Sequence, residues 1–137
     1  MKKILILIIA ISLFAVLTKA IATTNDYDEI ANSDAVGIIL YAKKINGLYT
    51  DFKIDFQGSI LSKPYWVNIT NPTWSPEIIY EDISQDGKKE LVIILTKGTG
   101  TGVLEREVHV FQMQQRKSDK TQSLIPVEVP VNEPLEI

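Results

Sequence analysis

Cysteine is absent from this 137-residue sequence, and histidine occurs once, at His109. The missing thiols exclude disulfides, thiolate zinc sites and cysteine nucleophiles. A single histidine excludes a multi-histidine metal site and leaves little basis for a serine–histidine catalytic pair. The remaining composition, 45% hydrophobic and 23% charged residues, is that of one globular domain with its own core.

The N-terminus has the pattern of a secretory signal. Lys2 and Lys3 precede an apolar run over residues 4–17, and Ala20-Ile21-Ala22 has the small-x-small form of a cleavage site. The run is shorter than the roughly 20 apolar residues that span a bilayer. We therefore predict a helical signal peptide over residues 1–22, cleavage after Ala22 and secretion. Retention of residues 4–22 as a membrane anchor is the alternative.

The mature chain is expected to be acidic. Loss of Lys2, Lys3 and Lys19 leaves 11 of the 14 basic residues against 17 acidic ones, a net charge of −6. Binding to nucleic acid requires clustered lysine and arginine, so a nucleic-acid partner is not expected. The partner would be a protein or a cell-wall ligand, and no stable membrane span would remain after cleavage.

The clearest structural pattern is a hairpin. Residues 36–44 are rich in β-forming types, and Asn46-Gly47 favours a tight turn. Residues 48–56 then alternate, which predicts that Leu48, Thr50, Phe52, Ile54 and Phe56 share one buried face. Tyr49, Asp51, Lys53 and Asp55 would share the other face.

The rest of the mature chain also predicts short strands. They are expected over residues 65–69, 77–81, 91–95 and 103–113, with a loop at 71–76, a glycine-rich turn at 97–102 and a polar loop at 112–122. Prolines confine residues 124–131 to a sheet edge or to non-sheet structure. The expected fold is all-β, a small antiparallel sandwich or half-open barrel of about six to seven strands. Residues 23–34 would be a flexible leader with one helical turn at 27–31, and residues 35–137 a single β domain.

One segment carries the spacing of a cation-binding loop. Oxygen-bearing side chains fall at Asp82, Ser84, Asp86 and Glu90, Lys88 would offer its backbone carbonyl, and Gly87 permits a sharp turn. Alternate residues of such a loop point inward, and calcium accepts six to eight oxygen ligands in flexible geometry. The predicted cofactor is therefore calcium. The alternative is an ordinary Asp-Gly hairpin turn with solvated carboxylates.

Asp82, Ser84, Asp86, Gly87 and Glu90, followed by the apolar residues 91–95, resemble the calcium loop of FG-GAP and VCBS-type β repeats. That resemblance covers about fifteen residues and implies a calcium site flanked by strands. Ser84 and Gln85 depart from the residues that those families prefer, which implies weaker binding. Those families build propellers from many copies, and this chain has one copy.

Other candidate residues have structural interpretations. His109 lies in a predicted strand and is expected to be half-buried, and Trp66 is expected in the core. The sequence places Trp74 in neither the core nor the surface. Asp51 and Asp55 fit the charged outer face of a strand better than an acid–base pair. Lys97 and the glycines after it lack the spacing of a phosphate loop.

The chain as a whole also resembles small uncharacterised exported proteins of Gram-positive spore-forming bacteria. The residues that carry this resemblance are 39–44, 46–49, 82–91, 100–102 and 108–110. It implies no activity, and it implies that some relatives continue beyond the position of Ile137, so the β domain is expected to be C-terminally incomplete.

Three functions are open from the sequence. The first is a secreted, non-enzymatic β module, stabilised by calcium, that binds a partner at the cell surface or outside the cell. The second is a metal-free structural or inhibitory envelope protein. The third, least favoured, is a hydrolase that uses carboxylates, which requires two acidic side chains converging in a cleft.

Overall fold

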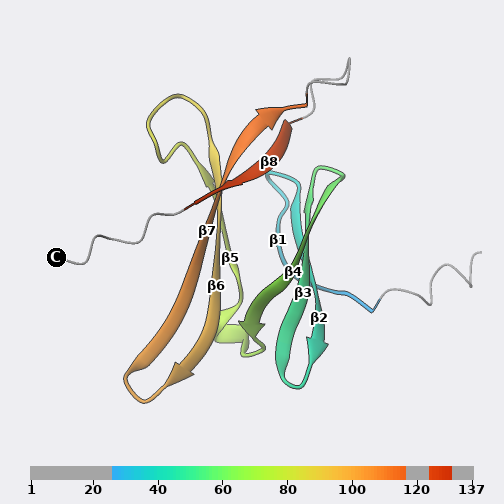
Figure 1. Ribbon diagram of the computed structural model, residues 1–137, viewed down its shortest axis with the longest axis vertical. Coiled ribbons are helices and arrows are strands. Elements are labelled where there is room, and N and C mark those ends of the chain that lie inside the picture. Colours follow the sequence, from blue (N-terminus) through green and yellow to red (C-terminus); the bar gives the residue numbers. More distant parts are fainter. Residues whose placement is uncertain (1–25, 117–123, 131–137) are drawn as a thin grey trace, which may run out of the picture.

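The structure, a computed structural model, describes residues 26–116 and 124–130. Within them, β1 (Asp28–Ser33), β2 (Ile38–Ile45), β3 (Leu48–Phe56) and β4 (Ser59–Ile69) form sheet A. β5 (Glu77–Glu81), β6 (Glu90–Gly100), β7 (Val103–Gln115) and β8 (Leu124–Val129) form sheet B. Both sheets are antiparallel, with their strands in chain order (Figure 1). The predicted all-β class is confirmed, although the described residues contain eight strands instead of six to seven.

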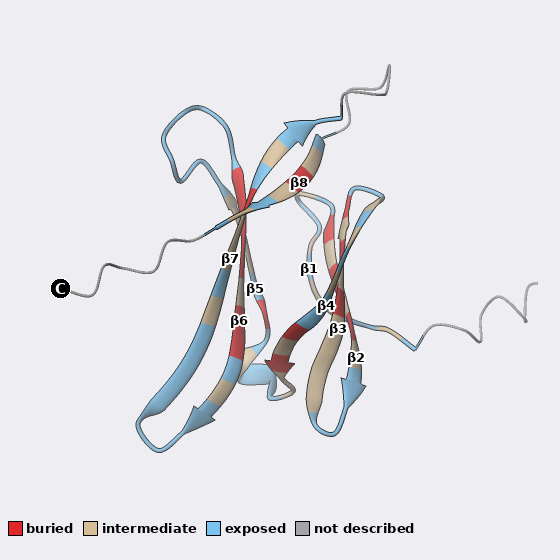
Figure 2. Ribbon diagram, viewed as in Figure 1, coloured by how far each residue is buried: buried red, intermediate tan, exposed pale blue. Residues whose placement is uncertain are grey.

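The two sheets face each other around one shared core. Figure 2 shows the buried segments on the strands that line the space between the sheets. Because successive side chains of a strand point to opposite faces, the core residues of β2, β3 and β6 alternate along each strand. The core consists of Ile38, Leu40, Ala42, Phe52, Ile54, Phe56 and Trp66 from sheet A, and Leu91, Ile93, Leu95 and Phe111 from sheet B. The core position predicted for Trp66 is confirmed, and the fold is a sandwich.

The β2–β3 hairpin forms as predicted, but a bulge interrupts its alternation. Asn46 and Gly47 have φ of 50° and 75° and make the turn. Asp51 also has a positive φ, 52°, and the register of β3 shifts between Thr50 and Phe52. Phe52, Ile54 and Phe56 are buried as expected. Beyond the bulge the faces exchange, so that Tyr49 packs against the core in place of Leu48 and Thr50.

The next hairpin was not predicted. Gln57 and Gly58, with φ of 51° and 92°, form a tight turn, and β4 begins directly after it at Ser59 instead of at Tyr65. The register of β4 shifts between Lys63 and Val67, opposite Asp51. Pro64 lies inside this irregular stretch, where its missing N–H removes no ladder hydrogen bond.

Residues 28–33 differ from the expected flexible leader with a helical turn. They form β1, which pairs with β2 at the edge of sheet A. The sequence of β1 does not show the alternating pattern of a strand, because a register shift between Glu29 and Ala31 interrupts its period of two. Ile30 and Ala31 pack against the core, and this burial anchors a segment that is otherwise polar.

The β6–β7 hairpin is longer than predicted. β6 is a central strand, as predicted, with Leu91, Ile93 and Leu95 fully buried on one face and Val92 5% exposed on the other. It continues through Gly98 to Gly100, so the predicted turn over residues 97–102 is wrong for 97–100 and the chain reverses at Thr101 and Gly102. β7 extends to Gln115, into the predicted loop over 112–122. β8 is an edge strand that contains Pro126, as predicted.

Asn68 joins the two sheets through a buried side chain. Its Oδ1 accepts the backbone N–H of Thr96 on β6 at 2.6 Å, while its Nδ2 donates to the carbonyls of Ile69 and Trp74 at 2.8 Å each. Asn68 is 0% exposed and Thr96 is 1% exposed. This side chain therefore fixes β4, the loop with the short 3-10 helix η1 (Pro72–Trp74) and β6 relative to one another.

The predicted signal over residues 1–22 and the C-terminal residues 131–137 lie outside the described residues. Among residues 26–116 and 124–130, no helix has the length and apolarity needed to cross a membrane.

Candidate metal centre in the β5–β6 loop

Residues 82–89 connect β5 to β6 as an exposed loop, and its backbone turns twice through the left-handed region. Gln85 has φ of 60° and Gly87 has φ of 86°. Glycine adopts that conformation without steric cost, which explains Gly87 in the Asp-Gly pair. These turns bring both ends of the loop close enough for its acidic side chains to meet.

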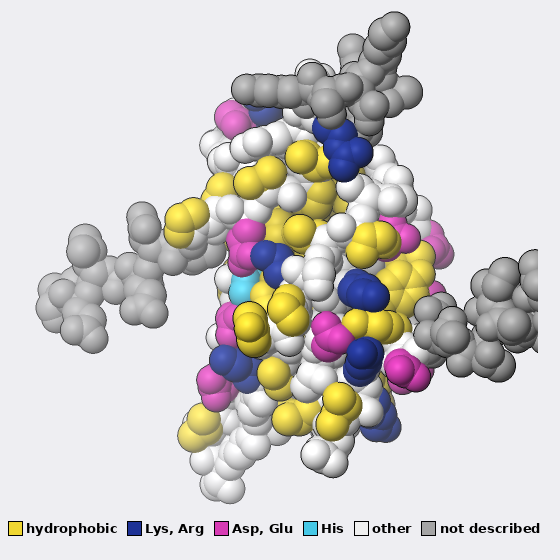
Figure 3. Space-filling model, turned by 45° about the vertical axis from the view of Figure 1, so that its right-hand side comes forward, with side chains coloured by type: hydrophobic (Ala, Val, Ile, Leu, Met, Phe, Trp, Pro, Cys, Tyr) yellow, Lys and Arg dark blue, Asp and Glu magenta, His cyan; other side chains and the backbone are white. Residues whose placement is uncertain are grey.

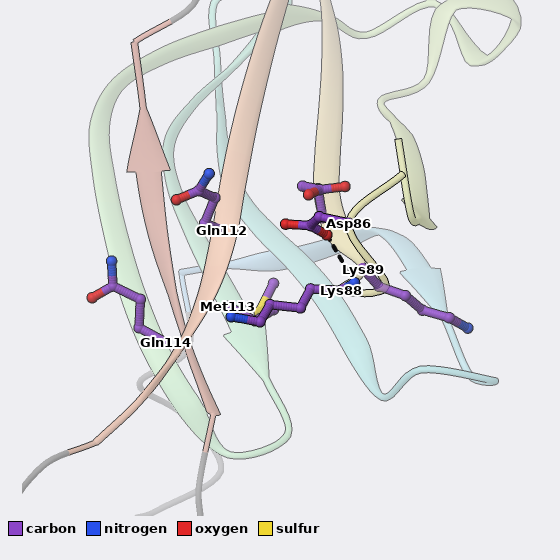
Figure 4. Close-up of a pocket in the computed structure, with 7 residues that line it drawn as sticks. Asp86, Lys88, Lys89, Gln112, Met113 and Gln114 are labelled. Carbon is purple, nitrogen blue, oxygen red and sulfur yellow. Dashed lines mark hydrogen bonds between the residues drawn. The ribbon is translucent and has the colours of Figure 1, made fainter. Parts of the chain in front are cut away.

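The first two carboxylates hold the loop by accepting backbone N–H groups. Asp82 accepts the N–H of Asp86 at 3.2 Å and that of Gly87 at 2.9 Å. Asp86 accepts the N–H of Lys88 at 2.8 Å, the bond dashed in Figure 4. That bond, with a further one from Ser84 and the charge of Lys88, keeps the pKa of Asp86 below its usual value despite partial desolvation.

Glu90, the first residue of β6, accepts hydrogen bonds from the other end of the loop. It is 6% exposed. One of its oxygens accepts the Ser84 hydroxyl at 2.7 Å, and the other accepts the backbone N–H groups of Ile83 at 2.8 Å and Ser84 at 3.4 Å. The Ser84 bond lowers the pKa of Glu90; desolvation and the charge of Asp86 oppose this shift without reversing it. Glu90 therefore stays ionised beside another carboxylate.

Asp82, Asp86 and Glu90 converge. Each offers a carboxylate oxygen, and these oxygens all lie within 4.8 Å of one another. Ser84 contacts the same group through Glu90, and Lys88 contacts it by donating its N–H to Asp86. The role of the Lys88 carbonyl as a ligand stays a prediction. Each of the three carboxylates retains at least one lone pair beyond those used for hydrogen bonds, so the cluster fits a hard cation that binds oxygen.

A hollow of about 240 Å³ lies beside the cluster. Asp86 and Glu90 line one side of it and Gln112 to Gln114 of β7 line the other. In Figure 4, the side chain of Lys88 extends beside Met113, whereas that of Lys89 points away. Lys89 instead lies over the ring of Tyr80, 5.6 Å from its centre.

A second charged cluster, around His109, was not predicted. The imidazole stacks on Trp66 with ring centres 4.1 Å apart. His109 is half-buried, as expected, and its side chain is 12% exposed. Its Nδ1 lies 2.5 Å from Glu128, and its Nε2 lies 2.6 Å from Glu107 outside hydrogen-bonding direction. Glu128 also binds Lys63 of sheet A. The cluster ties β8 to sheet A, and its partners are too distant in sequence to be paired from spacing.

Desolvation tends to raise the pKa of both glutamates in this second cluster, but the neighbouring cations outweigh it. A hydrogen bond from Lys97 and the charge of His109 lower the pKa of Glu107. Hydrogen bonds from Lys63 and His109 do the same for Glu128. The imidazole occupies the space between the two carboxylates.

Asp51 and Asp55 have separate structural partners. Asp51 accepts the Tyr27 hydroxyl at 2.6 Å and pairs with Lys43 at 3.2 Å, and the Tyr27 bond is the main cause of its lowered pKa. Asp55 accepts the N–H of Gly58 in the following turn at 2.7 Å. Each carboxylate thus stabilises local structure.

Comparison with protein-family models, curated proteins and solved structures gives no match for this chain.

Proposed function

We propose that this protein is a secreted, non-enzymatic β-sandwich module that calcium stabilises through the β5–β6 loop. The observation that supports this function is the convergence of the Asp82, Asp86 and Glu90 oxygens within 4.8 Å. Three ionised carboxylates so close together repel one another, and a divalent cation would remove that repulsion. The module would bind a protein or a cell-wall ligand at the cell surface or outside the cell.

Calcium suits this loop better than magnesium. Magnesium requires near-octahedral geometry and keeps most of its waters, whereas calcium tolerates irregular sets of oxygens. At a Kd of about 10⁻⁴ M, one millimolar calcium would stabilise the fold by about 1.4 kcal/mol. For a domain of this size that corresponds to roughly 5–10 °C in Tm.

Thermal unfolding of the protein in 1 mM calcium, 1 mM magnesium or chelator tests the proposal. We expect calcium to raise Tm by several degrees and magnesium to raise it less. Asp86→Asn should abolish the calcium effect, because it removes a negative charge from the cluster. The loop itself should be retained, because the amide oxygen can still accept the Lys88 N–H. Asp34→Asn, which makes the same change in the exposed β1–β2 turn, should leave the effect intact. A wild-type Tm indifferent to calcium would refute the calcium role.

A metal-free structural or inhibitory envelope protein is the second candidate. It is favoured by the loop's own hydrogen bonds, because Asp82 and Glu90 each accept from two residues of the loop. Unfolding that is insensitive to calcium, together with a protein captured by crosslinking at the cell envelope, would support this candidate. The hydrolase hypothesis gains no support from Asp51 and Asp55, since their partners are structural.

A further inference from the structure

A second, larger hollow lies where the β5–β6 loop meets the last residues of β7. Its volume is about 670 Å³, which lies within the roughly 300–1,000 Å³ of small-molecule sites. Tyr80 of β5, Met113 of β7 and Leu124 of β8 supply its apolar lining, and Lys88, Lys89 and two glutamines of β7 complete it. We call it the end hollow. It adjoins the smaller hollow beside the carboxylate cluster, but none of the three clustered carboxylates lines it.

The apolar lining of the end hollow is continuous with the core of the sandwich. Tyr80 and Met113 both pack against the core residues, and the ring of Tyr80 lies 6.1 Å from that of Phe56. Leu124 is 38% exposed. An apolar ligand would remove this surface from water, which is favourable. The unbranched side chain of Met113 can adapt to the shape of such a ligand.

The charged side chains that line the end hollow are basic. Among the described residues, neither Lys88 nor Lys89 forms an ion pair with a carboxylate. In contrast, an acidic partner lies beside each of Lys43, Lys63 and Lys97. Figure 3 shows acidic and basic side chains interspersed on the side that it brings forward, whereas none of the described residues that line the end hollow is acidic. The end hollow therefore favours an anion, although the chain as a whole is acidic.

We propose that the end hollow binds a small amphipathic anion, an alkyl chain that ends in a carboxylate or a phosphate. The alkyl chain would cover Tyr80, Met113 and Leu124, and the anionic head would pair with Lys88 or Lys89. A lysine ammonium pairs with either head, because it is a compact charge with three N–H donors. The site uses no residue of the carboxylate cluster as a ligand, so this proposal and the calcium role can fail separately.

Met113 provides a direct reporter of binding. The sequence contains two methionines, Met1 and Met113, so a methyl NMR spectrum of methionine-labelled protein reports on the end hollow through the one signal that Met113→Leu removes. We call it the reporter signal. The exported protein, with its N-terminus established by intact mass, is titrated with decanoate. Chelator is present because calcium precipitates alkyl carboxylates, and the loop has hydrogen bonds of its own. We expect a saturable shift of the reporter signal with Kd of about 1 mM or tighter, since the ligand is small.

Ligands with the same chain and a different head test the part played by charge. Decyltrimethylammonium carries the opposite charge and should bind about 10-fold more weakly than decanoate, or not at all. Decyl phosphate, titrated in parallel, distinguishes the two anionic heads. Tighter binding of decyl phosphate would assign a phosphate-headed lipid as the ligand, and tighter binding of decanoate would assign a free fatty acid. Either result supports the proposal.

Lys88→Gln combined with Lys89→Gln should raise the Kd for decanoate about 10-fold, and it keeps the backbone N–H that Asp86 accepts. Lys44→Gln, at the exposed end of β2, is the matched control and should leave Kd unchanged. Leu124→Ser is a second variant, to be used if circular dichroism shows that the double variant is unfolded, and it should also weaken binding. A reporter signal that does not shift up to about 5 mM decanoate would overturn the proposal. Equal binding of the cationic ligand, or an unchanged Kd in the folded double variant, would overturn it too.

Discussion

Asn68 offers the sharpest test of how the two sheets are held together. Replacement by alanine removes three hydrogen bonds, to Thr96, Ile69 and Trp74. At about 1 kcal/mol net for each bond, the loss is about 3 kcal/mol. Because Thr96 is buried, its backbone N–H cannot bind water instead, and the true cost should exceed that sum.

Urea unfolding at pH 7, followed by tryptophan fluorescence and far-UV circular dichroism, measures this cost. We expect Asn68→Ala to lower the free energy of unfolding by at least 3 kcal/mol with an unchanged m-value. Asn71→Ala is the control: Asn71 is exposed, and its side chain caps η1 with one bond to the Thr73 N–H at 3.0 Å. Its cost should stay near 1 kcal/mol. Equal losses in the two variants would refute the role given to Asn68.

Two further predictions concern the charged clusters. The fold lowers the pKa of Asp86 and of Glu90, so the stability that these groups contribute is complete above their ordinary pKa values near 4 and is lost as the pH falls through the lowered values. Thermal unfolding measured as a function of pH should therefore show Tm falling once the pH is below about 4.5. In Ser84→Ala, which lacks the hydrogen bond to Glu90, this fall in Tm should be less steep. Glu128→Gln should weaken the contacts of β8 with Lys63 and His109, so amide exchange should quicken in β8 but stay unchanged in β2; equal protection of β8 in both proteins would contradict this.

Local chemistry made part of the fold predictable. Asn46-Gly47 specifies a turn whose geometry few other pairs allow, and the apolar residues 91–95 require burial on both faces. The other parts of the fold could not be predicted from the sequence, because strand pairing is irregular there. The bulge at Asp51 exchanges the faces of β3, and the shift between Glu29 and Ala31 hides β1. A bulge depends on the partner strand, which the sequence of a single strand does not contain.

One part of the candidate site could likewise be predicted from the sequence, and another part could not. The carboxylates of the β5–β6 loop lie within nine residues of one another, so their spacing alone predicts that Asp82, Asp86 and Glu90 meet. The cluster around His109 joins β4, β7 and β8. Its assembly follows from the packing of one sheet on the other, and no spacing along the chain encodes that packing.

The bulges and the proline described above have a consequence for aggregation. β1, β4, β5 and β8 are the edge strands, and an unprotected edge would template further strands into fibrils. β1 and β4 are bent by register shifts, and β8 contains Pro126, which has no N–H to offer. β5 has only five residues, with exposed Glu77 and Glu81 at its ends. Each edge of the two sheets, within the residues that the structure describes, thus resists the addition of a strand, and we expect no amyloid growth at high concentration.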